Sequence, residues 1–275
     1  MSATSRTQRQ KSLRRQQELR RIESMRHEAF LATAVIEDAT ESLPDQPWRK
    51  RKFFLGVALL PVCLLVILTF SELLLREFKG GFWRSEGFWF FASGSLCWFC
   101  MGWLRREPGL MYVFAHEMTH ALAVRLSGGR VHRIRVDHGG GFVDTDKTNT
   151  LITLSPYVVP FYTGVVFALY GLLSLFLDMH HEIPLGAGWS IKGVWVFYFL
   201  IGLTWCFHVT FTLQVLETEQ SDLLHNGEFF SILLIFLINV VILATLFIAA
   251  SPTVGWTHVF SSMRELLGPL LRLFF

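Results

Sequence analysis

The sequence predicts an all-α polytopic membrane protein with about six transmembrane helices. Two observations support this fold class. Of the 275 residues, 52% are hydrophobic and only 17% are charged, which is too apolar a balance for an ordinary soluble domain. The apolar residues also gather in long runs, and a helix needs roughly 20 mainly apolar residues to cross a bilayer.

Six apolar runs approach or exceed this length. In chain order they cover residues 53–75, 88–104, 110–126, 151–177, 194–216 and 229–250. The second and third runs are short, and only the charged turn at residues 105–109 separates them. The runs therefore predict one domain over residues 53–250, embedded in the lipid bilayer, with little room for a soluble domain between the helices.

The two ends of the chain have a different composition. Residues 1–52 are rich in arginine, which is compatible with nucleic-acid binding but is more typical of a tail held in the cytoplasm by its positive charge. We therefore expect no nucleic-acid partner. Residues 251–275 mix Arg264, Glu265 and Arg272 with leucines, a pattern that predicts a C-terminal interfacial helix.

The topology that these charges predict is inconsistent with the count of apolar runs. Residues 125–147 are also basic and should lie on the same cytoplasmic side as the tail. Three runs separate the two basic segments, whereas an even number of crossings is required. Either the run 88–104 is re-entrant, or the tail lies outside, or one of the charge signals misleads.

The four cysteines give little support to a redox function. Cys97 and Cys100 have the C-x-x-C spacing of redox and zinc sites, and Cys63 and Cys206 are isolated. All four lie within apolar runs, where cysteine usually acts as a small apolar residue. We expect them to fill space between helices.

The third apolar run contains the sequence His116-Glu117-Met118-Thr119-His120. Residues four apart lie on the same face of a helix, so both histidines can bind one metal ion. Glu117 can then reach a water molecule on the open side of that metal. This is the H-E-x-x-H pattern of zinc hydrolases, and ionisable residues within a membrane span mark a functional site by default.

A catalytic zinc site needs a third protein ligand, with the fourth position left for water. Asp222 is one candidate, because Ser221 can cap the following helix, and Asp222 would then lie in the first turn of that helix. The residues alone leave several rivals open, namely His208, Glu217, Glu219, His225, Asp137, Asp144 and Asp146. Asn226 and His225 are candidates for stabilising an oxyanion.

The run from His116 to Val131 resembles the site-2 protease family of intramembrane zinc metalloproteases. In that family the zinc motif lies on a membrane helix that ends soon afterwards at a glycine, here Gly128. A later helix supplies an aspartate. The resemblance implies that His116, His120 and Asp222 bind one catalytic Zn²⁺ and that Glu117 is the general base.

The resemblance also implies a small membrane-associated β-hairpin after the zinc-motif helix. Residues 131–136, the glycine turn at 139–141 and residues 142–145 would form it. An exposed strand edge can hold an extended peptide, so we expect Gly140, Gly141, Phe142 and Val143 to bind substrate. An ordinary connecting hairpin is the alternative.

A second family, the membrane-embedded prenyl-protein proteases, also uses H-E-x-x-H. Its third ligand is a glutamate followed four residues later by an aspartate, but the residue four before Asp222 is Thr218. We therefore prefer the site-2 protease resemblance.

The expected function is hydrolysis of a peptide bond in or near a transmembrane segment of a membrane protein substrate. The expected location is the bacterial inner membrane. Because the sequence shows no attached sensor domain, we expect control by a regulatory membrane partner or by the N-terminal tail. Two other functions stay open. One is a catalytically silent scaffold or chaperone that binds membrane segments, and the other is a transporter whose histidines line a pathway.

Overall fold

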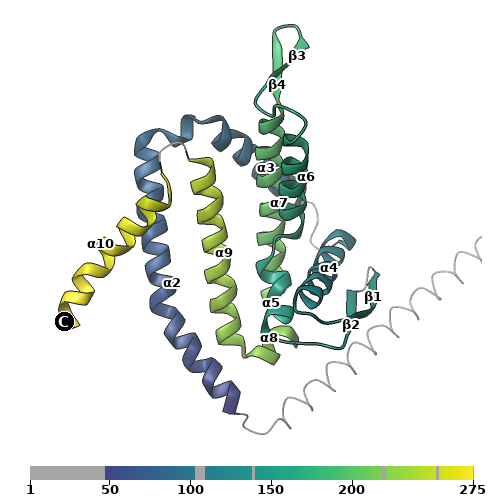
Figure 1. The fold of residues 1–275 in the computed structure, drawn as a ribbon, viewed down its shortest axis with the longest axis vertical. Helices are drawn as coiled ribbons and strands as arrows, with labels where there is room; N and C mark the ends of the chain where they lie inside the picture. Colours follow the sequence, from purple (N-terminus) through teal and green to yellow (C-terminus); the bar gives the residue numbers. More distant parts are fainter. Residues whose placement is uncertain (1–46, 103–108, 138–139, 218–220, 252–253, 275) are drawn as a thin grey trace, which may run out of the picture. The chain divides into compact units, whose positions relative to one another are not determined.

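The computed structural model describes residues 47–102, 109–137, 140–217, 221–251 and 254–274. The chain divides into two units, Met1–Lys50 and Arg51–Phe275, and the description below concerns the second unit together with the start of its first helix. Helices account for most of the described residues, and two short hairpins interrupt them (Figure 1).

The first described helix packs along a helix from the other end of the chain. Helix α2 (Pro47–Gly80) begins with a proline, which suits the first helical position because no N–H is needed there. Its partner is α9 (Glu228–Ala250). The ring centroids of Phe53 and Phe229 lie 5.5 Å apart, and those of Phe70 and Phe247 lie 5.8 Å apart.

A close pair of helices forms a second part of the fold. After the short 3₁₀ turn η1 (Phe82–Arg84), α3 (Glu86–Gly102) packs against α7 (Gly193–Leu216). A Cβ atom at Gly94 would lie 1.9 Å from the carbonyl oxygen of Phe199, and one at Gly202 would lie 2.0 Å from that of Phe91. These two glycines therefore let the helix backbones touch, as small residues do in membrane helix pairs.

The histidine motif lies on α4 (Leu110–Leu126), which ends two residues before Gly128. The predicted β-hairpin follows. Strands β1 (Val131–Asp137) and β2 (Gly140–Thr145) pair antiparallel, with Ile134 opposite Val143. Both strands pack beside α4, so the hairpin lies next to the helix that carries the motif.

The fourth apolar run forms two helices and not one. Helix α5 (Thr150–Val158) and helix α6 (Phe161–Ser174) meet at an angle of 74° across Val159 and Pro160. Pro160 favours this break because the residue before a proline avoids the helical conformation. The short α8 (Ser221–Asn226) and α9 pack against α5, around a buried cluster formed by Leu154, Tyr157, Val158, Leu223 and Ile235.

A second hairpin and a last helix complete the fold. Strands β3 (Glu182–Gly186) and β4 (Trp189–Lys192) form a second hairpin that the sequence did not predict. Glu86 anchors it, accepting hydrogen bonds from Lys192 Nζ at 3.1 Å and from Trp195 Nε1 at 2.7 Å. The last helix, α10 (Trp256–Phe274), covers most of the segment that was expected to be a C-terminal helix.

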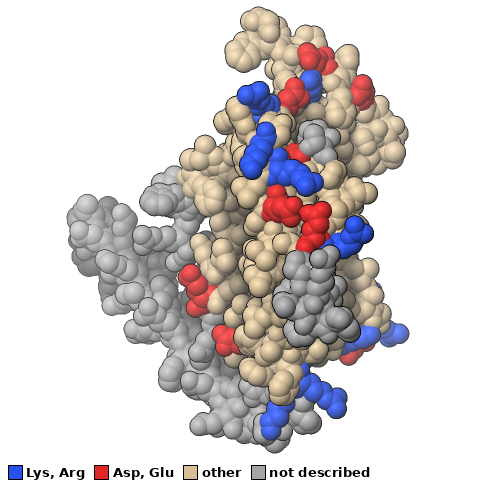
Figure 2. Space-filling view, turned by 90° about the vertical axis from the view of Figure 1, so that its left-hand side faces the viewer, with Lys and Arg blue, Asp and Glu red and all other residues tan. Residues whose placement is uncertain are grey.

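Three helices in the described part of the chain are long and apolar enough to cross a membrane. They are the 31 residues Lys50–Gly80, then Gly193–Leu216 and Glu228–Ala250, and the bent pair α5–α6 can count as a fourth. The prediction of six spans is therefore not confirmed, because α3 and α4 have only 17 residues each. Broad uncharged areas lie between the charged side chains on the face in Figure 2.

Candidate metal centre

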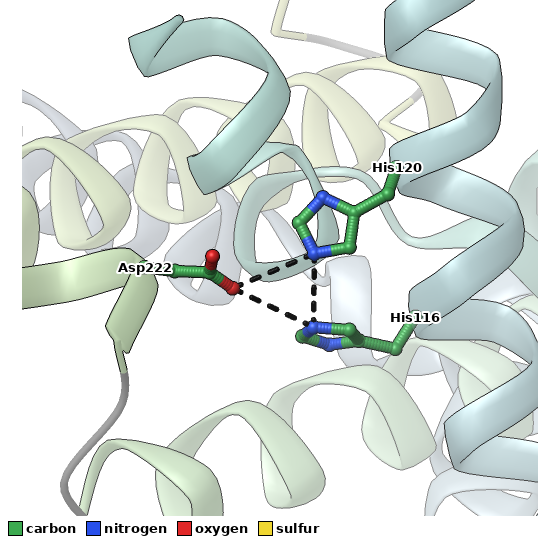
Figure 3. Close-up of side chains that lie close together, drawn as sticks. All are labelled: His116, His120 and Asp222. Carbon is green, nitrogen blue, oxygen red and sulfur yellow. Dashed lines mark hydrogen bonds and ion pairs between the residues drawn. The ribbon is translucent and has the colours of Figure 1, made fainter. Parts of the chain in front are cut away.

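Two helices that are distant in sequence bring three ligand side chains together. His116 and His120 lie one turn apart on α4, as predicted, and point toward Asp222 on α8 (Figure 3). Because α8 begins at Ser221, Asp222 lies in its first turn. These three residues are the one group among the described His, Cys, Asp and Glu residues with an arrangement that could hold a metal ion.

The spacing of the three ligand atoms fits zinc. The Nε2 atoms of His116 and His120 lie 3.2 Å apart, and Oδ2 of Asp222 lies 3.4 Å from His120 Nε2 and 3.8 Å from His116 Nε2. Bonds from zinc to nitrogen or oxygen are about 2.0–2.2 Å long. In a tetrahedral site, neighbouring ligand atoms therefore lie about 3.3–3.5 Å apart. Two imidazoles and one carboxylate are also ligands that zinc commonly takes in catalytic sites.

The outer nitrogens of both imidazoles are held by neighbouring groups. His120 Nδ1 donates to the carbonyl oxygen of Ile152 at 2.8 Å, and His116 Nδ1 lies 3.2 Å from the hydroxyl of Tyr112. Such contacts fix the ring orientation and leave Nε2 for the metal. The Ile152 carbonyl lacks its helical donor because Pro156, four residues later, has no N–H.

The aspartate is held in a similar way. The hydroxyl of Tyr157 donates to Asp222 Oδ2 at 3.3 Å. The rival third ligands lie elsewhere: Asp137 pairs with Arg135 at 3.0 Å, and Asp146 accepts from the backbone N–H of Arg130 at 2.7 Å. His208, Glu217, His225 and Asp144 do not join the ligand group, and Glu219 lies outside the described residues.

Glu117 is buried, with 6% of its surface exposed, and β2 lies against it. A Cβ atom built on Gly141 would lie 2.5 Å from Cγ and 2.8 Å from Oε1 of Glu117. Of the other residues expected to bind substrate, Gly140 and Val143 are half-buried, whereas Phe142 is exposed. The hairpin therefore brings Gly141, which has no side chain, directly to the expected base.

The two residues suggested as oxyanion donors do not fit that role. Asn226 is fully buried, and its Nδ2 donates both hydrogens within the protein, to Thr153 Oγ1 at 2.5 Å and to the carbonyl oxygen of Asp222 at 3.0 Å. His225 is exposed and is not part of the ligand group. The hypothesis about Asn226 is wrong because a saturated amide has no hydrogen left to donate.

A small cavity, with space for about one water molecule, borders His116. Its lining includes His116, Thr119, Pro156 and His208. The sequence left open whether the proline segment forms a wall of the site or only the start of a helix. The position of Pro156 favours the wall.

Comparison with known protein families gives one match, to the peptidase M50B-like family over residues 95–213. The match includes the whole histidine motif and ends before Asp222, so the assignment of the third ligand depends on the geometry above. Comparisons with curated proteins and with solved structures give no match. The family model covers residues 95–213, and this match supports membership of the site-2 protease (M50) family.

Proposed function

We propose that the protein is an intramembrane zinc metalloprotease that cleaves a peptide bond in or near a transmembrane segment of a membrane protein substrate. The observation that supports this most directly is the set of three ligand atoms at zinc spacing, next to Glu117. Bound zinc would supply an acidified water and a polarised carbonyl group. His116, His120 and Asp222 would hold it.

Glu117 is the proposed general base. It follows His116 directly on α4, and its burial keeps bulk water away from the carboxylate. It would accept the proton of the attacking water and pass it to the amine of the leaving peptide. Tyr112 and Ile152 would keep the two imidazoles oriented during this transfer.

We also propose that the outer edge of β2 binds the substrate. A peptide bond within a helix is shielded by the hydrogen bonds of the helix, so the segment must become extended before cleavage. An extended peptide can pair with a strand edge, and Gly141 would place it beside Glu117. Gly140, Phe142 and Val143 would form the rest of this edge.

The remaining proposals concern the location, topology and control of the protein. We propose a multi-pass protein of the bacterial inner membrane, with a cytoplasmic basic tail at residues 1–52 and α10 at the membrane interface. A regulatory membrane partner would control the access of substrate to the site. The connections within the described part of the chain are short and leave little room for a regulatory domain there.

The test is metal content after purification in detergent. Wild type should hold about one zinc per chain, Asp222→Ala should lose or weaken it, and Asp144→Ala, a rival carboxylate, should keep it. Glu117→Gln should keep zinc and lose cleavage of co-expressed single-span proteins. Zinc retained by Asp222→Ala would move the third ligand elsewhere, whereas no zinc in wild type, even after addition, would refute the protease and favour the scaffold.

A further inference from the structure

The buried side-chain amide of Asn226, close to the ligand group, uses all of its hydrogen bonds to hold neighbouring elements together. Asn226 ends α8, and none of its surface is exposed. Its Oδ1 accepts from Lys52 Nζ at 2.6 Å and from Thr150 Oγ1 at 2.8 Å, while Nδ2 donates to Thr153 and to the carbonyl oxygen of Asp222. All four hydrogen-bonding positions of the amide are therefore occupied.

Lys52 connects α2 to this network. Its ammonium group also donates to Thr150 Oγ1 at 3.1 Å, so one side chain of α2 contacts both α5 and α8. Hydrogen bonds from a charged donor are shorter and about twice as strong as neutral ones. The lysine belongs to the basic run before the first apolar run, which the sequence alone relates only to topology.

The helix that carries Asp222 depends on such contacts. Helix α8 has only six residues, which is far too short to be stable alone. Leu223 packs it into the buried cluster with Tyr157, and Asn226 fixes the carbonyl group of Asp222 one turn earlier. A carboxylate that binds metal needs its backbone fixed, since a shift of about 0.5 Å already departs from productive geometry.

We propose that Lys52 is a positioning residue for Asp222, acting through Asn226. The proposal rests on the proposed zinc site. It gives the start of α2 an effect on metal affinity, which is transmitted through the hydrogen bonds of Lys52 to Asn226 and Thr150.

The experiment compares Lys52→Met, which keeps the length of the side chain without its charge, with Arg51→Met, which removes the neighbouring exposed charge. Zinc affinity is measured by competition with a chelator in the full-length protein in detergent. Hydrogen exchange of the α8 backbone amides gives a second readout that needs no metal. Lys52→Arg keeps a cationic donor and serves as the rescue variant.

The expected result for Lys52→Met is about ten-fold weaker zinc binding, as for other groups that support metal ligands, with faster exchange in α8. Arg51→Met should change neither quantity, and Lys52→Arg should restore most of both. Equal exchange in Lys52→Met and Arg51→Met, or faster exchange with unchanged zinc affinity, would overturn the proposal. Wild type without zinc would refute the proposed function, and exchange alone would then decide whether Lys52 holds α8.

Discussion

Replacing Gly141 with alanine would place a methyl group 2.5 Å from Cγ of Glu117 and 2.8 Å from the backbone oxygen of Arg135. Carbon atoms in contact normally lie about 3.5–4.0 Å apart, so the shortfall is about 1.0–1.5 Å. The backbone of β1 cannot yield as easily as the end of a glutamate side chain. We therefore expect Glu117 to move by about 1 Å.

A displacement of about 1 Å at a reacting group can lower the rate about 100-fold. The expected cost in folding free energy is small, about 1 kcal/mol, at the lower end of the range for overpacking, because Gly141 itself is an exposed residue. Zinc affinity should not change, since none of the three atoms nearest to the methyl group belongs to a metal ligand. The predicted phenotype is an enzyme that folds and binds zinc but cleaves slowly.

The assay is cleavage of a panel of tagged single-span proteins co-expressed with each variant, scored by the size of the product. Glu117→Gln is the inactive reference. Gly164→Ala on α6 is the matched control, because its Cβ atom would meet nothing within 4 Å and the residue lies outside the proposed substrate-binding edge. Cleavage by Gly141→Ala at the level of Gly164→Ala, or a loss of zinc, would refute the reasoning.

Two further predictions concern α5 and the second hairpin. Pro156→Ala should stabilise α5, because alanine restores an N–H directed at the Ile152 carbonyl. The new N–H would compete with His120 for that carbonyl and should weaken zinc binding about ten-fold. Unchanged zinc affinity in the chelator assay would contradict this. The hydrogen bond from Trp195, followed by those from Lys192, lowers the pKa of Glu86 below its ordinary value of 4.5. The contribution of ionised Glu86 to the free energy of unfolding should be complete above that value and disappear as the pH falls through the lowered pKa. Acid unfolding of wild type and of Glu86→Gln measures this, and the variant should lack this pH-dependent contribution.

The local part of the site could be predicted from the sequence because it depends on helix geometry alone. Residues 116 and 120 share a helix face wherever α4 lies, and Glu117 follows from the same spacing. The proximity of Asp222 could not be derived from its neighbours. It was expected only from the family resemblance, and the structure then placed its carboxylate within 3.4 Å of His120.

The remaining features depend on how distant segments pack. Pro156 and Pro160 predict an interruption of the helix, but neither the 74° angle of the bend nor the packing of α5 against α4 and α8 can be read from the sequence. The contact between Gly141 and Glu117 also needs the hairpin to fold back onto α4, which no local pattern specifies. The six-span prediction is not confirmed, because α3 and α4 have only 17 residues each, a length at which an apolar run does not by itself distinguish a membrane span from a shorter helix.

Helix α5 has only nine residues, yet supports for all three proposed ligands converge on it. Ile152 orients His120, and Tyr157 both contacts Asp222 and packs its ring 5.3 Å from that of His116. For inhibitor discovery, this convergence means that a compound could inhibit the site without binding the metal ion. A compound that displaced α5 slightly would disturb every ligand at once without carrying a zinc-binding group.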